Sequence, residues 1–234
     1  MINFLIPKSI KLSLRLLNQL ITDLLNGNIQ NFAKARKKDF NLKHTIQITQ
    51  QLRPNKNKLQ NLILASKSIE PIVILPGEIF SFWKAVGQPS RQNGYVESRS
   101  IVNNKIKNTI GGGLCQISGL IYHLSLLCGL ETIERHNHSK DIYNESTRFA
   151  PLGSDATIVY GYKDLRVKNN LGFPVQFKFV FKNSSLTIVL NSLKEVKCKN
   201  VSFLENGKRA DVIEVFTLVN NKKIVESIYE RGSA

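Results

Sequence analysis

The amino-acid sequence predicts an α+β fold. N-terminal amphipathic helices come first, followed by a mostly antiparallel β domain packed around one buried central helix at about residues 115–128. Apolar residues recur at helical spacing near the N-terminus and again over residues 114–127. After residue 130 the chain contains only short strand-like runs separated by turn residues. Because helices and strands do not alternate along the chain, a doubly wound parallel sheet is not expected.

The first predicted helix carries one apolar stripe that ends at Asn26 and Gly27. Basic residues flank the stripe at Lys11 and Arg15. Two interpretations fit this pattern: the stripe packs on the protein core, which is the commoner outcome, or it lies on an anionic membrane surface. The apolar residues of the stripe are Ile10, Leu14, Leu17, Ile21 and Leu24.

Residues 28–58 are polar and predict a connecting region with a short basic helix near residues 32–40. A second helix is predicted over residues 57–68, where apolar residues again follow helical spacing. The chain is therefore expected to have three parts. These are a basic helical region at 1–56, an α+β core domain at 57–192 and a C-terminal β-hairpin extension at 193–234.

The predicted strands alternate apolar and polar residues between turn signals. Residues 95–102 and 105–110 are strand-like runs on either side of Asn103 and Asn104, which predicts a hairpin. Further strands are predicted after the central helix, at residues 131–136, 156–160, 165–167, 175–181, 186–190, 211–219 and 223–229.

The net charge of +16 predicts an anionic neighbour. Residues 1–60 hold eleven basic and two acidic residues, and this net charge of +9 is more than half of the excess. Nucleic acid is not expected as a partner, because no helix-turn-helix, zinc-finger or ribonucleoprotein motif is present. An anionic membrane surface is one candidate partner for this charge. A genome rich in A and T, which favours Lys and Asn codons, is an alternative cause of the excess.

We expect a cytoplasmic protein that is either soluble or peripheral at the inner face of the membrane. Charged residues interrupt the apolar N-terminal stretch, so neither a signal peptide nor a transmembrane helix is predicted. The three cysteines cannot all pair within one chain. On one helix, Cys115 and Cys128 would lie about 20 Å apart, too far for a disulfide, which favours reduced thiols.

The segment GGGLCQIS, residues 111–118, is the main candidate for chemistry. A cysteine in the first turn of a helix lies at the positive end of the helix dipole, which favours the nucleophilic thiolate over the thiol. The Gln116 N–H is expected to contribute to an oxyanion hole. A phosphate-binding loop is not expected, because no Lys-Ser or Lys-Thr follows the glycines Gly111, Gly112 and Gly113.

Histidines that could act as the base for this cysteine lie in the segment ERHNHS, residues 134–139. If the strand continues to residue 138, then Glu134, His136 and His138 project from one face as a single cluster. Asp155 or Asp164 would orient the histidine. The same cluster with Cys115 is also compatible with a zinc site, although neither C-x-x-C nor H-E-x-x-H is present. No other cofactor is expected.

Each candidate also has a purely structural interpretation. Free cysteine is among the most buried residue types, so Cys115 could be a small side chain at a tight bend. Histidines at alternate positions more often lie on the solvent-exposed face of an amphipathic strand than act as metal ligands.

Four motifs resemble those of the VanW family of bacterial proteins: PGEIFSF at 76–82, GGGLCQ at 111–116, ERHNHS at 134–139 and DAT at 155–157. The resemblance covers roughly residues 57–182. Family members linked to vancomycin resistance can carry a different residue at position 155, so the resemblance favours Asp164 as the histidine's partner. The residues on family motif positions are Pro76, Gly77, Glu78, Phe80, Ser81, Gly111, Gly112, Gly113, Cys115, Gln116, Glu134, Arg135, His138 and Ser139.

The resemblance implies a role in the cell envelope but no particular reaction. Our first hypothesis is a cysteine-dependent thiol acyltransferase or hydrolase that processes an acyl or amide group of a peptidoglycan precursor. The alternative is a non-catalytic binding protein for a cell-wall peptide or glycopeptide, with a basic region that docks on the membrane. The residues expected to bind the ligand are Gly111, Gly112, Gly113, Ser118, Glu78, Ser81, Arg135 and Ser139.

Overall fold

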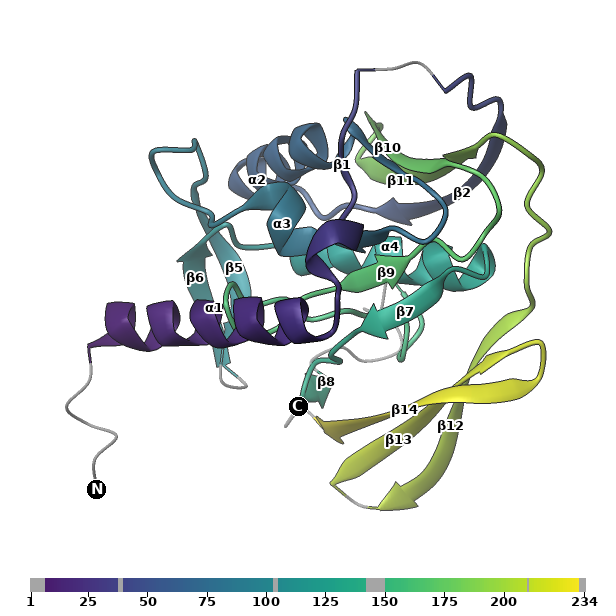
Figure 1. Ribbon diagram of the computed structural model, residues 1–234. Helices are drawn as coiled ribbons and strands as arrows, with labels where there is room; N and C mark the ends of the chain where they lie inside the picture. The colour runs from purple at the N-terminus through teal and green to yellow at the C-terminus, as the bar shows by residue number, and fades with distance from the viewer. Residues whose placement is uncertain (1–6, 38–39, 103–104, 142–149, 210, 232–234) are drawn as a thin grey trace.

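The computed structural model describes residues 7–37, 40–102, 105–141, 150–209 and 211–231, and its architecture is α+β as the sequence predicts (Figure 1). Helices and mostly antiparallel strands surround one central helix. The helices of the described residues are α1 (Lys8–Leu25), α2 (Lys56–Ile69), α3 (Phe82–Val86) and α4 (Cys115–Leu127), with a short 3-10 helix η2 (Ile29–Asn31).

The largest sheet has five strands in the order β1-β3-β10-β11-β2, and all of its pairs are antiparallel. Its apolar side chains, among them Phe177, Ile188 and Leu190, are buried in the main core. The strands are β1 (Lys34–Ala35), β3 (Ile72–Ile74), β10 (Val175–Lys182), β11 (Ser185–Ser192) and β2 (His44–Gln51).

Two smaller antiparallel sheets hold the segments that lead to the site. The predicted hairpin is present as β5 (Glu97–Val102) and β6 (Lys105–Ile110), and its turn lies outside the described residues. A three-stranded sheet has the order β4-β9-β7. Its strands are β4 (Ile79–Ser81), β9 (Arg166–Lys168) and β7 (Glu131–Glu134). The strand predicted at 156–160 is wrong, because this segment makes a turn with one bridge between Val159 and Lys163.

The C-terminal segment forms a sheet of its own in the order β12-β13-β14-β8. Its strands are β12 (Val201–Arg209), β13 (Val212–Val219), β14 (Lys222–Arg231) and β8 (Lys140–Asp141). The sequence predicts β13 and β14 but not β12. A small second core forms between this sheet and the chain near Leu152, and it contains Ile213, Val215 and Tyr229. Because β8 joins the edge of β14, the C-terminal sheet is attached to the chain that follows β7.

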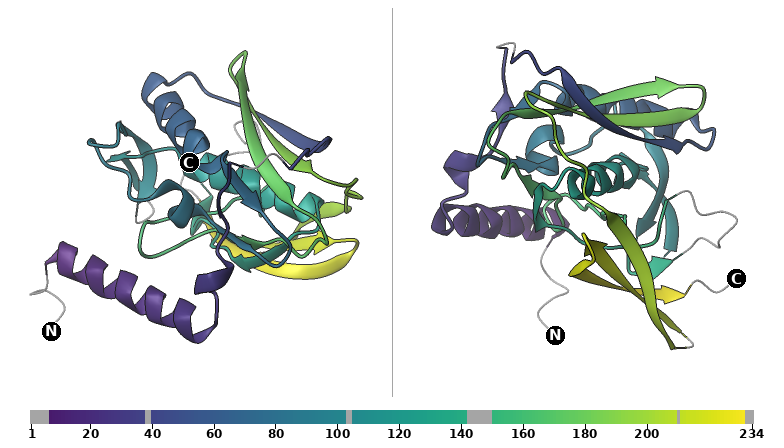
Figure 2. Two further views of the ribbon diagram at one scale, coloured as in Figure 1. Left: turned by 45° about the horizontal axis from the view of Figure 1, so that its top comes forward. Right: turned by 90° about the vertical axis from the view of Figure 1, so that its right-hand side faces the viewer.

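Helix α4 occupies the centre of the molecule, between the five-stranded sheet and the C-terminal sheet (Figure 2). Its sequence is apolar on most sides, as expected for a helix that is covered all round. Its buried residues include Ile117, Leu120, Ile121, Tyr122 and Leu124. The predicted buried central helix is therefore confirmed, and its first turn is the point from which the candidate site is built.

Residues 1–56 are more closely integrated with the core than a separate helical region would be. The short helix predicted near residues 32–40 is wrong, because β1 pairs with β3 and Phe32 bridges to Ile79 there. Strand β2 then forms the edge of the main sheet, with Ile46 and Ile48 packed against the core. The sequence of β2 does alternate apolar and polar residues, but its many Gln and Thr side chains give it the composition of a linker.

Helix α1 turns its predicted apolar stripe to the solvent. The exposed fractions run from 45% for Ile21 to 65% for Leu24. The opposite side packs on the protein, with Leu12 and Leu16 against the loop at Gly161. A buried ion pair between Asp23 and Arg166 fixes the C-terminal end of the helix. The interpretation that the stripe packs on the core is therefore wrong.

Among the described residues, none of the helices combines the length and the apolar character that a bilayer span requires.

Candidate functional site

Close contacts at the three glycines place Cys115 at the start of α4. A Cβ atom on Gly112 would lie 2.0 Å from the carbonyl oxygen of Ser98, so the two backbones can approach only because this residue has no side chain. Gly113 has a φ angle of +94° and lies under the side chain of Lys58. The chain can therefore pass between the β5 strand and α2 before it enters the helix at Cys115.

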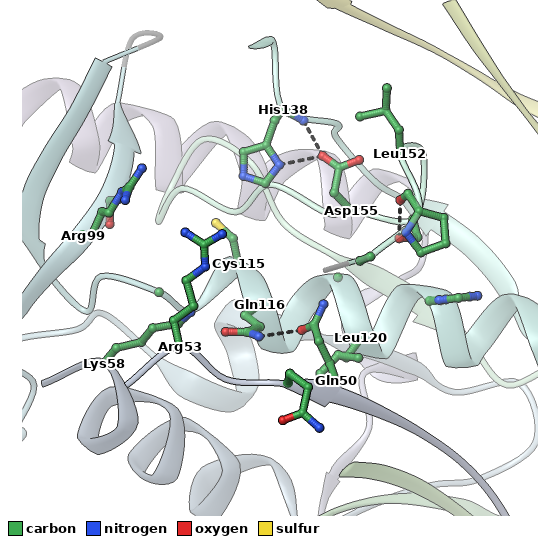
Figure 3. A pocket seen from close by; sticks show the side chains of 18 of the residues that line it. Gln50, Arg53, Lys58, Arg99, Cys115, Gln116, Leu120, His138, Leu152 and Asp155 are labelled. Atoms are coloured by element: carbon green, nitrogen blue, oxygen red, sulfur yellow. Dashed lines mark hydrogen bonds and ion pairs between the residues drawn. The ribbon is translucent and has the colours of Figure 1, made fainter. Parts of the chain in front are cut away.

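Cys115 lines a pocket of about 390 Å³ together with His138 and Asp155 (Figure 3). The remaining lining comes from segments that are far apart in the sequence, including the end of β2, the start of α2, β5 and β14. Apolar residues such as Leu120 and Leu152 line another part of the pocket. A cavity of this volume is of the size that binds small ligands or short peptides.

His138 and Asp155 form a tightly held pair beside the cysteine. The Nδ1 atom of His138 is 2.6 Å from Oδ2 of Asp155, and the backbone N–H of His138 donates to the same oxygen at 2.7 Å. The side chains of His138 and Cys115 are hydrogen-bonded to each other, and because Nδ1 is engaged by the carboxylate, Nε2 is the ring nitrogen that faces the sulfur (Figure 3). The imidazole thus has the orientation that a base needs next to a thiol.

Asp155 is fixed in turn by Arg135 and Tyr229. One guanidinium nitrogen of Arg135 is 2.9 Å from Oδ1 of Asp155, and the Tyr229 hydroxyl donates to the same oxygen at 2.5 Å. The side chain of Arg135 is only 4% exposed and also donates to the backbone carbonyl of Gly153. These contacts hold the carboxylate in place and prevent it from turning away from His138.

The electrostatics of the site favour a thiolate and an imidazolium. Burial raises the pKa of Cys115, but the hydrogen bond and charge of His138 and the Ile158 N–H outweigh burial and leave this pKa below its ordinary value. Burial lowers the pKa of His138, but Asp155 and Cys115 reverse the effect and raise it to about 10. Burial also acts to raise the pKa of Asp155, whereas His138 and Arg135 lower it to about 2.

Glu134, His136 and Asp164 lie in a different cluster. Strand β7 ends at Glu134, so the alternation that would align Glu134, His136 and His138 does not continue. Glu134 pairs with His136 at 3.0 Å and with Arg166 at 3.2 Å. Asp164 accepts a hydrogen bond from Ser81 at 2.5 Å and the Trp83 N–H at 3.1 Å. The structure thus places Asp155, and not Asp164, beside His138.

The four side chains that the sequence suggested as zinc ligands are therefore found in two separate places. His136 and Glu134 bind each other, whereas His138 and Cys115 lie at the pocket with Asp155. Across the described ranges, no three His, Cys, Asp or Glu side chains are grouped so that they could hold a metal ion.

Gln116 lines the pocket, but its backbone N–H donates to the carbonyl of Gly113 at 3.0 Å. This amide is therefore not open toward a substrate oxygen, contrary to the role expected from the sequence. The Gln116 side chain donates to Gln50 on β2 at 2.6 Å, while its own Oε1 atom is buried and has no partner within the described residues.

Most of the other predicted binding residues have structural contacts. Glu78 closes the turn at Pro76 and Gly77 by accepting from the Leu75 N–H. Ser81 caps α3, and Ser118 donates to the carbonyl of Ala156 at 2.6 Å. Of the predicted binding set, Gly113 lines the pocket, whereas Gly111, Gly112, Ser118, Glu78, Ser81, Arg135 and Ser139 do not.

Several pocket residues carry no motif in the sequence. Arg53, Lys58 and Arg99 line the pocket near Cys115, and Tyr229 reaches it from the last strand. Each comes from a segment that has no local signal for chemistry. Only the tertiary structure brings them to the cysteine.

Comparison with known proteins relates most of the core to one family. The family described as "VanW like protein" matches residues 57–191. The Bacillus subtilis protein named "Uncharacterized protein YoaR" is 32% identical over 138 residues, which are 59% of this chain and 44% of that protein. The Enterococcus faecalis "Vancomycin B-type resistance protein VanW" is 37% identical over 114 residues, which are 49% of this chain and 42% of that protein.

The matched segment therefore spans less than half the length of either relative. No solved structure is significantly similar to this chain.

Proposed function

The chain belongs to the VanW-like family, and from this premise we propose that it is a cysteine-dependent enzyme of the cell envelope that processes an acyl or amide group of a cell-wall peptide. The Enterococcus faecalis relative is named a vancomycin resistance protein, and this name is the basis for proposing a substrate in the cell envelope. The observation that carries the proposed chemistry is the chain of contacts from Cys115 through His138 to Asp155 at the wall of a pocket.

In the proposed reaction the thiolate of Cys115 attacks the carbonyl carbon of an amide, and a C–S bond forms. The tetrahedral intermediate collapses as the C–N bond breaks, and the Nε2–H of His138 gives its proton to the leaving amine. The product is a thioester on Cys115. Water or an acceptor amine then attacks this thioester and passes a proton to Nε2, which releases the acyl product and restores the thiolate.

Mass spectrometry tests this proposal directly. The protein is incubated with a muropeptide mixture, and intact masses are recorded for protein and peptides. The proposal expects an acyl adduct on the peptide that contains Cys115, together with hydrolysed or transferred products. Bound but unchanged muropeptides, with no adduct, would instead support the second candidate, a non-catalytic binding protein that uses the same pocket.

The pH dependence of alkylation is the first prediction. Because His138 lowers the pKa of Cys115, the rate with iodoacetamide is expected to reach half its plateau below pH ~8.5, the ordinary value for a cysteine thiol. The ion pair should persist until His138 loses its proton near pH 10. His138→Gln should move the midpoint upward. Cys198 is exposed and serves as the reference in the same chain.

A second prediction concerns α1, which we propose docks on anionic lipid. Its exposed apolar stripe lies in the segment that carries a net charge of +9, which matches the charge of an anionic bilayer. The protein is expected to sediment with vesicles of phosphatidylcholine and phosphatidylglycerol, but much less with phosphatidylcholine alone. The double variant Leu17→Gln, Leu24→Gln should lose most of this binding.

Leu204→Gln is the matched control, because Leu204 is 52% exposed on β12 and lies outside α1. If this control and the α1 variant lost binding equally, or if neither did, α1 would not be the docking surface. A protein partner would then be the better occupant of the stripe.

A further inference from the structure

The pocket has a strongly basic region beside the cysteine. Arg53 precedes α2, Lys58 lies in its first turn, and Arg99 comes from β5. All three line the same pocket as Cys115, and their side chains lie on the cysteine's side of it (Figure 3). They have no part in the proposed proton transfer between Cys115 and His138.

The positive charges of Arg53, Lys58 and Arg99 repel one another. Burial lowers the pKa of Lys58, and the charges of Arg53 and Arg99 lower it further. Within the described residues, the side chains of Lys58 and Arg99 form no ion pair with a carboxylate. Clustered like charges destabilise a folded protein unless an anion neutralises them. This arrangement therefore favours a pocket that binds a negatively charged group.

The backbone adds to the same field. The N-terminal ends of α2 and α4 both open on the pocket, since Asn55, Lys58, Cys115 and Gln116 all line it. Each helix end carries a partial positive charge. Gly113 has a further role, because a side chain there would collide with the stem of Lys58 at 2.7 Å. The third glycine of the triplet thus keeps Lys58 against the start of α4.

The pocket also contains carboxylates, but Asp155 is already neutralised by His138, Arg135 and Tyr229. Asp141 lies beside Lys140 at β8. Both carboxylates come from the chain after β7, whereas the basic side chains come from the segment before α2, from α2 itself and from β5.

We propose that Arg53, Lys58 and Arg99 form an anion subsite that binds a carboxylate or phosphate of the substrate next to the carbonyl group attacked by Cys115. This subsite deepens the proposed function and rests on it for the position of the reacting carbon. It selects peptides that end in, or carry, a negative charge close to the reactive bond. A neutral amide at that place would leave Lys58 and Arg99 without an ion-pair partner among the described residues.

Alkylation with two reagents tests the subsite without a substrate. Iodoacetate and iodoacetamide react with the same thiolate, but only iodoacetate is anionic. The ratio of their rates at Cys115 is expected to exceed the ratio at exposed Cys198 on the order of tenfold at low salt, because a basic cleft concentrates anions. The ratio should fall toward that of Cys198 as salt is added.

Charge variants separate the subsite from the imidazolium of His138. Lys58→Gln and Arg99→Gln should each lower the iodoacetate ratio several-fold, with the iodoacetamide rate little changed. Lys56→Gln is the matched control, because Lys56 is an exposed lysine of the same helix and does not line the pocket. If Lys58→Gln and Arg99→Gln left the ratio as it is in the unmodified protein, His138 alone would account for it and the subsite would be refuted.

Protection experiments identify the bound group. Sodium phosphate and N-acetylalanine are each tested for slowing iodoacetamide at Cys115. Stronger protection by N-acetylalanine indicates a carboxylate, stronger protection by phosphate indicates a phosphate, and either should vanish in Lys58→Gln. The protection of Cys115 can be measured whether or not the protein turns over muropeptides. A subsite without muropeptide turnover would refute only the proposed enzyme, and turnover without anion preference would refute only the subsite.

Discussion

Replacing Cys115 with alanine is expected to abolish processing of muropeptides, with a loss of turnover on the order of 10⁴-fold or more. The reason is that no other group in the pocket can form the thioester. Cys115 begins α4 and is only partly buried, so the shorter side chain should change the melting temperature little. Product formation is followed by mass spectrometry, and folding by thermal unfolding of the same samples.

Three further variants show whether the loss is chemical. His138→Gln and Asp155→Asn should lower turnover on the order of 10²-fold to 10⁴-fold, because the first removes the proton carrier and the second its orienting partner. Cys198→Ala should have wild-type turnover, since Cys198 is exposed and does not line the pocket. Full activity in Cys115→Ala would rule out the thiol mechanism, and the pocket would then have to be a binding site.

Replacing Gly112 with alanine is expected to have the largest effect on stability. The added Cβ would lie 2.0 Å from the Ser98 carbonyl oxygen and 2.3 Å from its carbon, and both are backbone atoms that cannot turn away. Overpacking of this kind costs about 3 kcal/mol, and β5 must shift for the chain to fold at all. The measurement is the midpoint of urea unfolding, followed by circular dichroism.

Gly172→Ala is the matched control. No atom lies within 4 Å of a Cβ built on Gly172, and its φ angle is outside the left-handed region. This variant should unfold at the urea concentration of the original protein, or slightly higher, because alanine restricts the unfolded chain. A Gly112→Ala protein as stable as this control would mean that Ser98 and Gly112 are not in close contact.

The sequence predicts the fold class well wherever one residue pattern decides the structure. The central helix is apolar nearly all round, and the hairpin of β5 and β6 consists of two regular runs, so both follow from local sequence. The sequence-based prediction of secondary structure fails where pairing with a distant strand determines the structure of a segment. Strand β2 has the polar composition of a linker, yet β11 pairs with it along its whole length from His44 to Gln51.

The same distinction applies to the site. Cys115 and the histidine segment could be identified from sequence, because a cysteine after three glycines and a pair of nearby imidazoles are local features. The choice between Asp155 and Asp164 could not be made, since it depends on where β7 ends and the chain leaves the sheet. Arg53, Lys58 and Arg99 come from two separate segments and meet only in the folded protein.

Two residues that support the site lie outside the stretch 57–191 that the family shares. Tyr229 on the last strand, β14, donates a hydrogen bond to Asp155, and Gln50 on β2 accepts one from Gln116. A truncated chain cut at the borders of that stretch would keep every recognisable motif and lose part of the frame that holds them. Domain borders drawn from sequence similarity are therefore the wrong place to trim this protein for biochemical work.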